Sequence, residues 1–164
     1  MIYEFCAENV TLLEKAMQAG ARRIELCDNL AVGGTTPSYG VTKAAVELAV
    51  NYDTTIMTMI RPRGGDFVYN ELEIAIMLED IRLTAQAGSQ GVVFGVLTAD
   101  KKLDKPNLEK LIATSKGMEI VFHMAFDELS DNNQLEAIDW LSQAGVTRIL
   151  TRAGVSGDSL EKRF

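Results

Sequence analysis

AGARRIEL, at residues 19–26, has the same pattern as two later stretches, AGSQGVVF at residues 87–94 and AGVTRIL at residues 144–150. Each copy joins the end of a helical pattern, through a glycine, to a short apolar run that is typical of a strand. Strands that follow one another through helices run parallel, because the helix carries the chain back to the same edge of the sheet. The repeat therefore predicts an α/β fold with a parallel sheet, and the closed form of such a sheet is the TIM-type (β/α) barrel.

The rest of the chain continues this alternation of strand and helix. Six short runs have strand character, and they lie at residues 3–6, 23–27, 55–60, 91–95, 119–122 and 148–150. The best-defined helix opens with a capping box formed by Asn70 and Glu73 and ends at Gly88. An open, doubly wound sheet is the competing architecture, but no Gly-x-Gly-x-x-Gly motif follows the first strand.

The length is short for a complete barrel, which has eight strands and usually at least about 200 residues. We therefore expect a single domain over residues 1–164 whose barrel is incomplete, with about six βα units and the last part of the fold missing. Such a barrel leaves an exposed parallel edge that must be covered. A homodimer across that edge is the partner we expect, and truncation of the gene is the other explanation for the short chain.

Composition excludes several classes of protein. The chain is 47% hydrophobic and 24% charged, as is ordinary for a globular protein, and its net charge of -7 argues against a nucleic-acid-binding surface. No apolar run approaches membrane-spanning length, and the N-terminus lacks the pattern of a signal peptide. Two cysteines do not make a disulfide framework. We expect a cytoplasmic protein with reduced thiols, and neither nucleic acid nor membrane as a partner.

Two arginines follow the third predicted strand, in the stretch MIRPRGGDF at residues 59–67. Pro62 restricts the backbone around it, and the glycine pair at residues 64–65 allows a sharp turn or a close approach to a ligand. Guanidinium groups held in this way suit a carboxylate or a phosphate, so Arg61 and Arg63 are candidate anion-binding residues. The alternative is a loop stabilised locally by ion pairs to Asp66 or Glu71.

Two thiols are expected to converge on neighbouring strands. Strand alternation places Glu4 and Cys6 on one face of the first strand and Glu25 and Cys27 on one face of the second. Thiolates select soft ions such as Cu(I) and Zn(II), and the thioethers of Met57 and Met59 on the third strand suit Cu(I) further. Core packing is the alternative, and the residue types alone favour it, since unpaired Cys and Met are common in cores.

His123 is the only histidine and comes directly after the fifth predicted strand, with Asp127 four residues later. At the carboxyl end of a barrel strand a histidine can act as a general base, a phosphate donor or a metal ligand, and a satisfied structural donor is the alternative. Glu25 is expected to face the barrel interior, where an acid is costly unless it is paired or used. We expect Arg61 to pair with Glu25, with a Glu4–Arg61 pair as the alternative.

Four groups of residues together resemble the CutC family, which is named for copper homeostasis. They are RIELC with GGTTPSYG (residues 23–27 and 33–40), MIRPRGGDF (59–67), GVVFGVLT (91–98) and FHMAFD (122–127). The resemblance implies a TIM-type barrel, a cytoplasmic location and an association with copper, with Cys6 and Cys27 as the Cu(I) ligands. It leaves activity open, because Glu25, Arg61, Arg63, His123 and Asp127 form a polar set that looks like an enzyme site.

The chain departs from the family pattern at two places. Met124 stands where the family usually has Arg, and TRAG at residues 151–154 replaces a more usual Thr-Ser-Gly-Gly. We expect both changes to weaken anion binding by these loops. Family members are also longer than this chain.

The leading hypothesis is a cytoplasmic copper-binding protein of copper homeostasis, with Cu(I) held by Cys6 and Cys27. The alternative is a barrel enzyme that acts on a small anionic substrate, with Arg61 and Arg63 binding the anion and with His123, Glu25 and Asp127 as candidate catalytic residues. A third possibility is a shortened interaction domain without a ligand.

Overall fold

A computed structural model describes residues 1–152 of the 164-residue chain. Six parallel strands follow one another in sheet order: β1 (Glu4–Glu8), β2 (Arg23–Cys27), β3 (Thr55–Met59), β4 (Gly91–Phe94), β5 (Glu119–Phe122) and β6 (Arg148–Ile149). Five α-helices lie between them: α1 (Leu13–Gln18), α2 (Tyr39–Ala49), α3 (Glu71–Ala87), α4 (Lys105–Thr114) and α5 (Asp131–Gln143). The predicted α/β class, the parallel sheet and the incomplete TIM-type barrel of six strands are confirmed.

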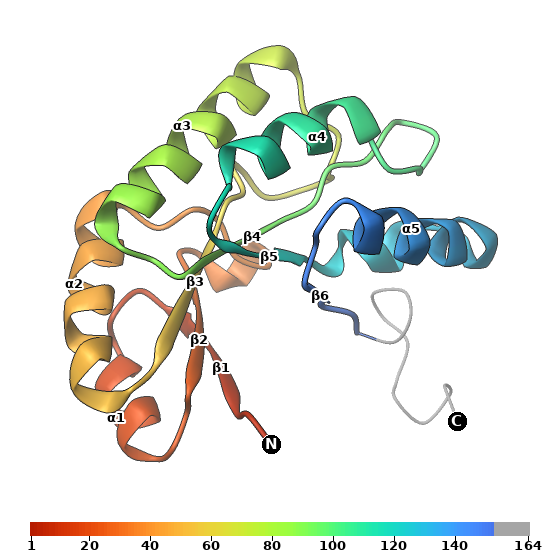
Figure 1. The fold of residues 1–164 in the computed structure, drawn as a ribbon. Coiled ribbons are helices and arrows are strands. Elements are labelled where there is room, and N and C mark those ends of the chain that lie inside the picture. Colours follow the sequence, from red (N-terminus) through yellow and green to blue (C-terminus); the bar gives the residue numbers. More distant parts are fainter. Residues whose placement is uncertain (153–164) are drawn as a thin grey trace.

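The sheet curls into half of a barrel, with helices outside the curl (Figure 1). Because side chains alternate along each strand, one set of residues points outward to the helices and the other points into the curl. The outward set contains Ile24, Leu26, Ile56, Val92 and Phe94, all buried beneath the helices.

A small separate core fills the inside of the curl. It consists of five buried residues from four neighbouring strands: Cys27, Met57, Met59, Val93 and Val121. The parallel register places Glu25 beside Met57 and Cys6 beside Glu25. The inner face therefore carries sulfur atoms and a carboxyl group together with aliphatic side chains.

Local signals explain most element boundaries. The predicted capping box of α3 is present, since the Asn70 side chain accepts a hydrogen bond from the Glu73 N–H and the Glu73 carboxylate accepts one from the Asn70 N–H. At the other end Gly88 adopts the left-handed conformation, with φ of 89°, that closes many helices.

The sequence also predicts that Asn9 caps the first helix and that the helix after the fourth strand starts near residue 108, and both predictions are wrong. Asn9 does not cap the first helix, because its backbone is left-handed and its N–H donates to the Cys27 carbonyl, so a turn precedes α1. Helix α4 begins at Lys105, three residues before the predicted start at residue 108. Asp104 caps it, and Pro106 lies in the first turn, where its missing N–H costs nothing.

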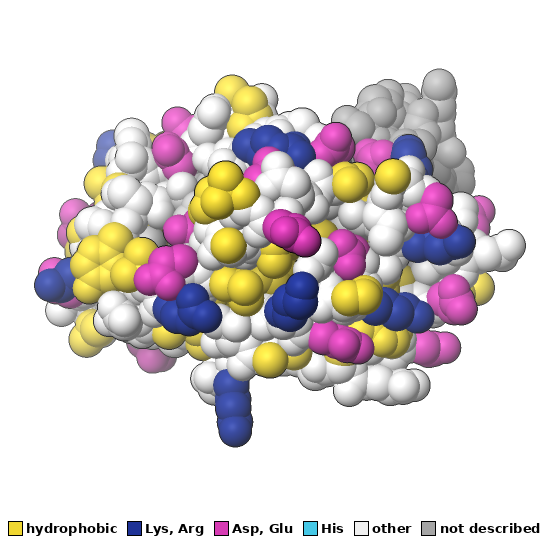
Figure 2. Space-filling model, turned by 90° about the horizontal axis from the view of Figure 1, so that it is seen from above, with side chains coloured by type: hydrophobic (Ala, Val, Ile, Leu, Met, Phe, Trp, Pro, Cys, Tyr) yellow, Lys and Arg dark blue, Asp and Glu magenta, His cyan; other side chains and the backbone are white. Residues whose placement is uncertain are grey.

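Figure 2 shows one face of the molecule, seen from above relative to Figure 1. Basic and acidic side chains are interspersed there with small hydrophobic groups. None of the helices within residues 1–152 combines the length and the hydropathy that crossing a bilayer requires.

Candidate functional site

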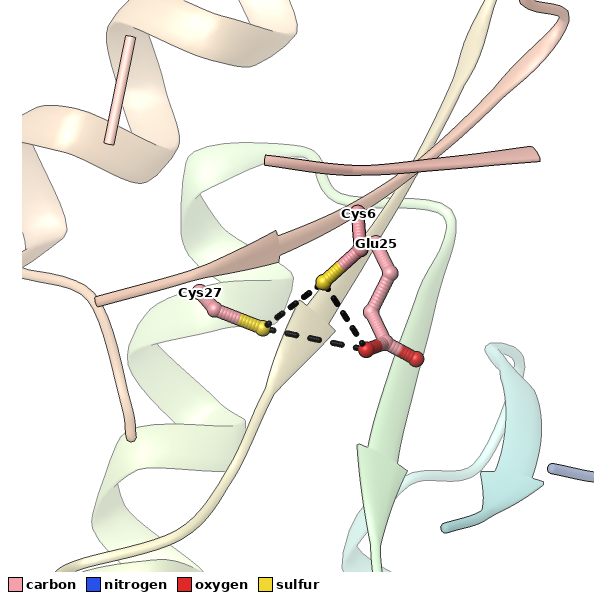
Figure 3. A group of neighbouring side chains, drawn as sticks. All are labelled: Cys6, Glu25 and Cys27. Carbon is pink, nitrogen blue, oxygen red and sulfur yellow. Dashed lines mark hydrogen bonds between the residues drawn. The ribbon is translucent and has the colours of Figure 1, made fainter. Parts of the chain in front are cut away.

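Cys6, Glu25 and Cys27 come together on the inner face of the first two strands. Their side chains point toward one another from β1 and β2 (Figure 3). One ligand atom from each residue lies within 4.8 Å of the other two. Sequence alternation predicted the shared face, and the parallel pairing of Cys6 with Glu25 brings the two strands into register.

The contacts within this group are weak hydrogen bonds that involve the thiols. The Cys6 Sγ donates to Glu25 Oε1 at 3.5 Å, and the Cys27 Sγ donates to the same oxygen at 3.8 Å. The two sulfur atoms are 4.0 Å apart. Glu25 Oε2 is buried and has no hydrogen-bond partner in the described part of the chain. The three side chains are therefore closely packed, but their hydrogen-bonding capacity is only partly used.

Two members of this group, Glu25 and Cys27, are buried, whereas Cys6 is exposed. Desolvation raises the pKa of Glu25 above its ordinary value, although the hydrogen bond from Cys6 opposes this. Hydrogen bonding to Cys6, burial and the nearby Glu25 together raise the pKa of the Cys27 thiol. Without a cation the buried thiol stays protonated, and a cation would favour the thiolate.

Arg61 lies at the end of β3 and is almost completely buried, with 2% of its surface exposed. Its Nη1 donates to the carbonyls of Val32 and Gly34, and its Nη2 donates to the carbonyl of Gly65. The guanidinium carbon lies 4.9 Å from the centre of the Phe67 ring. The expected ion pair with Glu25 is absent from the ion pairs of residues 1–152, and Glu4 pairs with Arg23 instead.

Arg63 stabilises its own loop. It forms ion pairs with Glu73 and Asp66, and its Nη2 donates to the Val68 carbonyl. Glu73 also belongs to the α3 capping box, so Arg63 ties the loop to the start of the helix. The sequence left open a loop stabilised by ion pairs to Asp66 or Glu71. The structure shows such a loop, with ion pairs from Arg63 to Asp66 and Glu73.

His123 is fully buried at the end of β5. Its Nδ1 accepts a hydrogen bond from the Ala125 N–H, and its Nε2 has no hydrogen-bond partner in the described part of the chain. Desolvation, together with the charge of Arg61, lowers the pKa of His123 to about 3. The ring lies 4.9 Å from that of Phe67, which therefore contacts both His123 and Arg61.

Asp127 anchors the loop that follows β6. Its Oδ1 accepts a hydrogen bond from the Thr151 hydroxyl and its Oδ2 accepts one from the Arg152 N–H. The Asp127 carboxylate is thus bonded to residues that follow β6, while the His123 Nδ1 bonds to the Ala125 N–H.

Two cavities of about 410 Å³ each adjoin these residues. Arg61, Phe67 and Asp127 line one of them, and Glu4, Cys6 and Glu25 line the other. Four residues line both: Leu30, Gly33, Met124 and Arg152. Sequence reasoning did not select Arg152 as a site residue, although its departure from the family pattern drew attention to the position.

The CutC family model matches residues 1–163. The chain belongs to the CutC family. A CutC family protein of Enterococcus faecalis is 54% identical over 164 residues, which are 100% of this chain and 78% of that protein. A CutC family protein of Bacteroides fragilis is 42% identical over 150 residues, and the match spans 92% of this chain and 58% of that protein.

Solved structures agree with the barrel architecture. A crystal structure described as copper homeostasis protein CutC, from Streptococcus agalactiae, has a TM-score of 0.95 and 45% identity, with coverage of 99% of this chain and 78% of that one. An archaeal fructose 1,6-bisphosphate aldolase has a TM-score of 0.61 at 15% identity, with coverage of 84% and 52%. The aldolase likeness concerns the fold alone.

Proposed function

We propose that this chain binds Cu(I) through the thiolates of Cys6 and Cys27, as a copper-binding protein of copper homeostasis. The observation that supports it is the convergence of two thiols and a carboxyl group within 4.8 Å on the inner face of the barrel. The name of the Streptococcus agalactiae relative supports the choice of copper among the soft ions.

The donor set fits a soft cation. Thiolates are the preferred ligands of Cu(I), and Met59 adds a thioether side chain to the same buried core as Cys27. Metal–sulfur bonds of about 2.3 Å, the value for zinc thiolates, allow two sulfur atoms on one ion to be up to about 4.6 Å apart. The separation of 4.0 Å lies within that limit. Glu25 would balance charge beside the thiolates.

An anaerobic titration with Cu(I), in competition with a chromophoric chelator, tests this proposal. Wild type is expected to saturate at a single Cu(I) per chain, and the Cys6→Ala, Cys27→Ala double variant is expected to lose this binding. Because the protons of the thiols must leave, the apparent affinity is expected to rise with pH. Met118→Leu, which removes a sulfur atom outside the cluster, is the control that keeps binding. Unchanged binding in the double variant contradicts the proposal.

A second candidate is a barrel enzyme acting on a small anionic substrate, and Glu25 favours it. A buried carboxyl group with a raised pKa beside a cavity of about 410 Å³ suits general acid–base work. In this candidate Glu25 and His123 are the acid/base groups and Arg61 provides the positive charge. Asp127 and Arg63 act as positioning residues, since their charged groups are bound to neighbouring loops.

Incubation with a library of phosphorylated and carboxylated small molecules, followed by mass spectrometry, tests the enzyme candidate. Conversion by wild type that is lost in Glu25→Gln and kept in Glu109→Gln, on the exposed surface of α4, supports it. If wild type converts no member of the library, the result contradicts the enzyme candidate.

We also propose a single domain over residues 1–164 in a cytoplasmic protein, because a reducing compartment keeps both thiols available. The match of the family model over residues 1–163 supports one domain. Besides the copper ion or the anion, we propose a second copy of the chain as a partner, which would cover the edge strands of the sheet.

A further inference from the structure

Arg61 is a buried cation without an anionic partner among the ion pairs of residues 1–152. Three backbone carbonyls accept hydrogen bonds from its terminal nitrogens, but carbonyl groups carry no net charge. Its Nε has no hydrogen-bond partner in the described part of the chain. A buried charge that is not balanced costs several kcal/mol, so this environment favours the arrival of an anion.

Arg152 lines the same cavity as Arg61. It belongs to the TRAG stretch that we expected to weaken anion binding, but its guanidinium adds a second positive charge beside Arg61. A Cβ atom placed on Gly33 would lie 3.3 Å from Arg61 Nη1 and 4.0 Å from Arg152 Nη2. The two guanidinium groups therefore flank one point of the cavity wall where the chain has no side chain. Gly33 has φ of +88°, so glycine is also favoured by the backbone there.

Fixed backbone contacts position both arginines. The Arg61 N–H donates to the Thr36 hydroxyl, and the Arg61 carbonyl accepts from the Thr36 N–H. The Arg152 N–H donates to Asp127, which comes from the 3₁₀ helix after β5. The backbone at Arg61 and at Arg152 is thus held before any ligand arrives, which reduces the entropic cost of binding.

The carboxylates that line this cavity have other partners. Both oxygens of Asp127 accept hydrogen bonds from the loop after β6. Glu128 forms an ion pair with Lys101. Neither carboxylate forms an ion pair with Arg61 within residues 1–152.

We propose that Arg61 and Arg152 bind a small oxyanion, of the phosphate or carboxylate type, in the cavity of about 410 Å³ lined by Gly33 and Phe67. Guanidinium groups match the oxygens of such anions through charged hydrogen bonds. Phe67 lines this cavity and also contacts the His123 ring. The proposal concerns binding alone: it supplies the anion site of the enzyme candidate but requires neither turnover nor copper.

Calorimetric titration of the copper-free, reduced protein with inorganic phosphate, and separately with malonate, tests the site at constant ionic strength. Wild type is expected to bind at least one of the two saturably. Arg152→Ser is expected to weaken that binding at least about tenfold, since a charged hydrogen bond contributes about 1.5–3 kcal/mol. Arg61→Lys is expected to do the same, because lysine cannot reproduce the fork of donors.

Arg82→Ser is the matched control, because Arg82 is an exposed arginine on α3 paired with Glu79. It is expected to bind like wild type. If Arg61→Lys fails to fold, Arg152→Ser and Arg82→Ser decide the question. Binding of phosphate alone or malonate alone identifies the anion class. The proposal is overturned if wild type binds neither anion, or if Arg152→Ser weakens binding no more than Arg82→Ser. Loss of copper binding or of turnover leaves this result unaffected.

Discussion

His123 is neutral in the folded protein over most of the pH range in which an exposed histidine titrates. Desolvation lowers its pKa to about 3 from an ordinary value near 6.5. Below about pH 6.5 the His123 imidazole therefore binds a proton in the unfolded chain but stays neutral in the folded chain. His123 makes the folded state progressively less stable as the pH falls from about 6.5 toward 3.

We predict that His123→Asn makes the free energy of unfolding less dependent on pH in the acid range. In wild type, His123 is expected to lower the free energy of unfolding by about 2 kcal/mol between pH 7 and pH 5. Asparagine can still accept the hydrogen bond from Ala125 but does not titrate. Urea unfolding of both proteins at several pH values measures the difference between their free energies of unfolding. Glu25, whose pKa is raised, has the opposite pH dependence, but it is present in both proteins and cancels in this difference. Parallel curves for the two proteins would show that His123 does not titrate as described.

Some of the site residues could be predicted from the sequence and others could not, for physical reasons. The convergence of Cys6 with Glu25 and Cys27 could be predicted because side chains alternate along each strand and the two strands are neighbours in a parallel sheet. The partners of Arg63 depend on where the start of α3 lies relative to the loop, and the position of Arg152 depends on Asp127. Contacts of this kind join segments far apart in the chain, and no local pattern predicts them.

At the scale of elements, α3 shows how local signals set the limits of a helix. The reciprocal bonds between Asn70 and Glu73 satisfy backbone groups that a helix start leaves unpaired. Glu73 also binds Arg63, so the same residue orders the loop after β3. The start of α3 and the loop that positions Arg61 are thus coupled.

We predict that Asn70→Ala lowers the free energy of unfolding by about 1 kcal/mol, the usual contribution of an N-cap side chain. Urea unfolding monitored by circular dichroism measures this change. Asn132→Ala, which changes an exposed asparagine in the first turn of α5, is the control and is expected to alter stability by less than about 0.5 kcal/mol. An equal effect of the two substitutions would contradict the role given to the capping box.

The order of strands and helices was predictable because each junction carries its own glycine, cap or periodicity. The starts of α1 and α4 were not predictable in the same way, since the turn at Asn9 depends on a hydrogen bond to the distant Cys27 carbonyl, and Asp104, three residues ahead of Asn107, caps α4. Of these two boundaries, only the start of α1 is set by a long-range contact, because the Asp104 cap of α4 bonds to Asn107 within the same turn.

For the whole molecule, the described sheet has two edge strands, β1 and β6. Most residues of β1 are exposed or partly exposed, and Tyr3 just before it is 67% exposed. Unpaired backbone groups at a parallel edge favour association with another strand. These features support the proposed homodimer.

Analytical ultracentrifugation over a range of concentrations is expected to show a reversible monomer–dimer equilibrium. Tyr3→Lys beside β1 is expected to shift this equilibrium toward monomer, because lysine at an edge opposes strand pairing. Leu135→Lys, on the exposed face of α5, is expected to leave it unchanged. A monomer at every concentration would contradict the proposal.

We place Cu(I) at the inner face of the half-barrel, where Cys6 and Cys27 lie 4.0 Å apart. X-ray absorption at the copper edge of the anaerobically loaded protein tests this placement most directly, because this measurement identifies the atoms bound to the metal. Sulfur neighbours in wild type that disappear in the Cys6→Ala, Cys27→Ala double variant are the predicted result. A copper ion surrounded only by nitrogen and oxygen in wild type would contradict the claim.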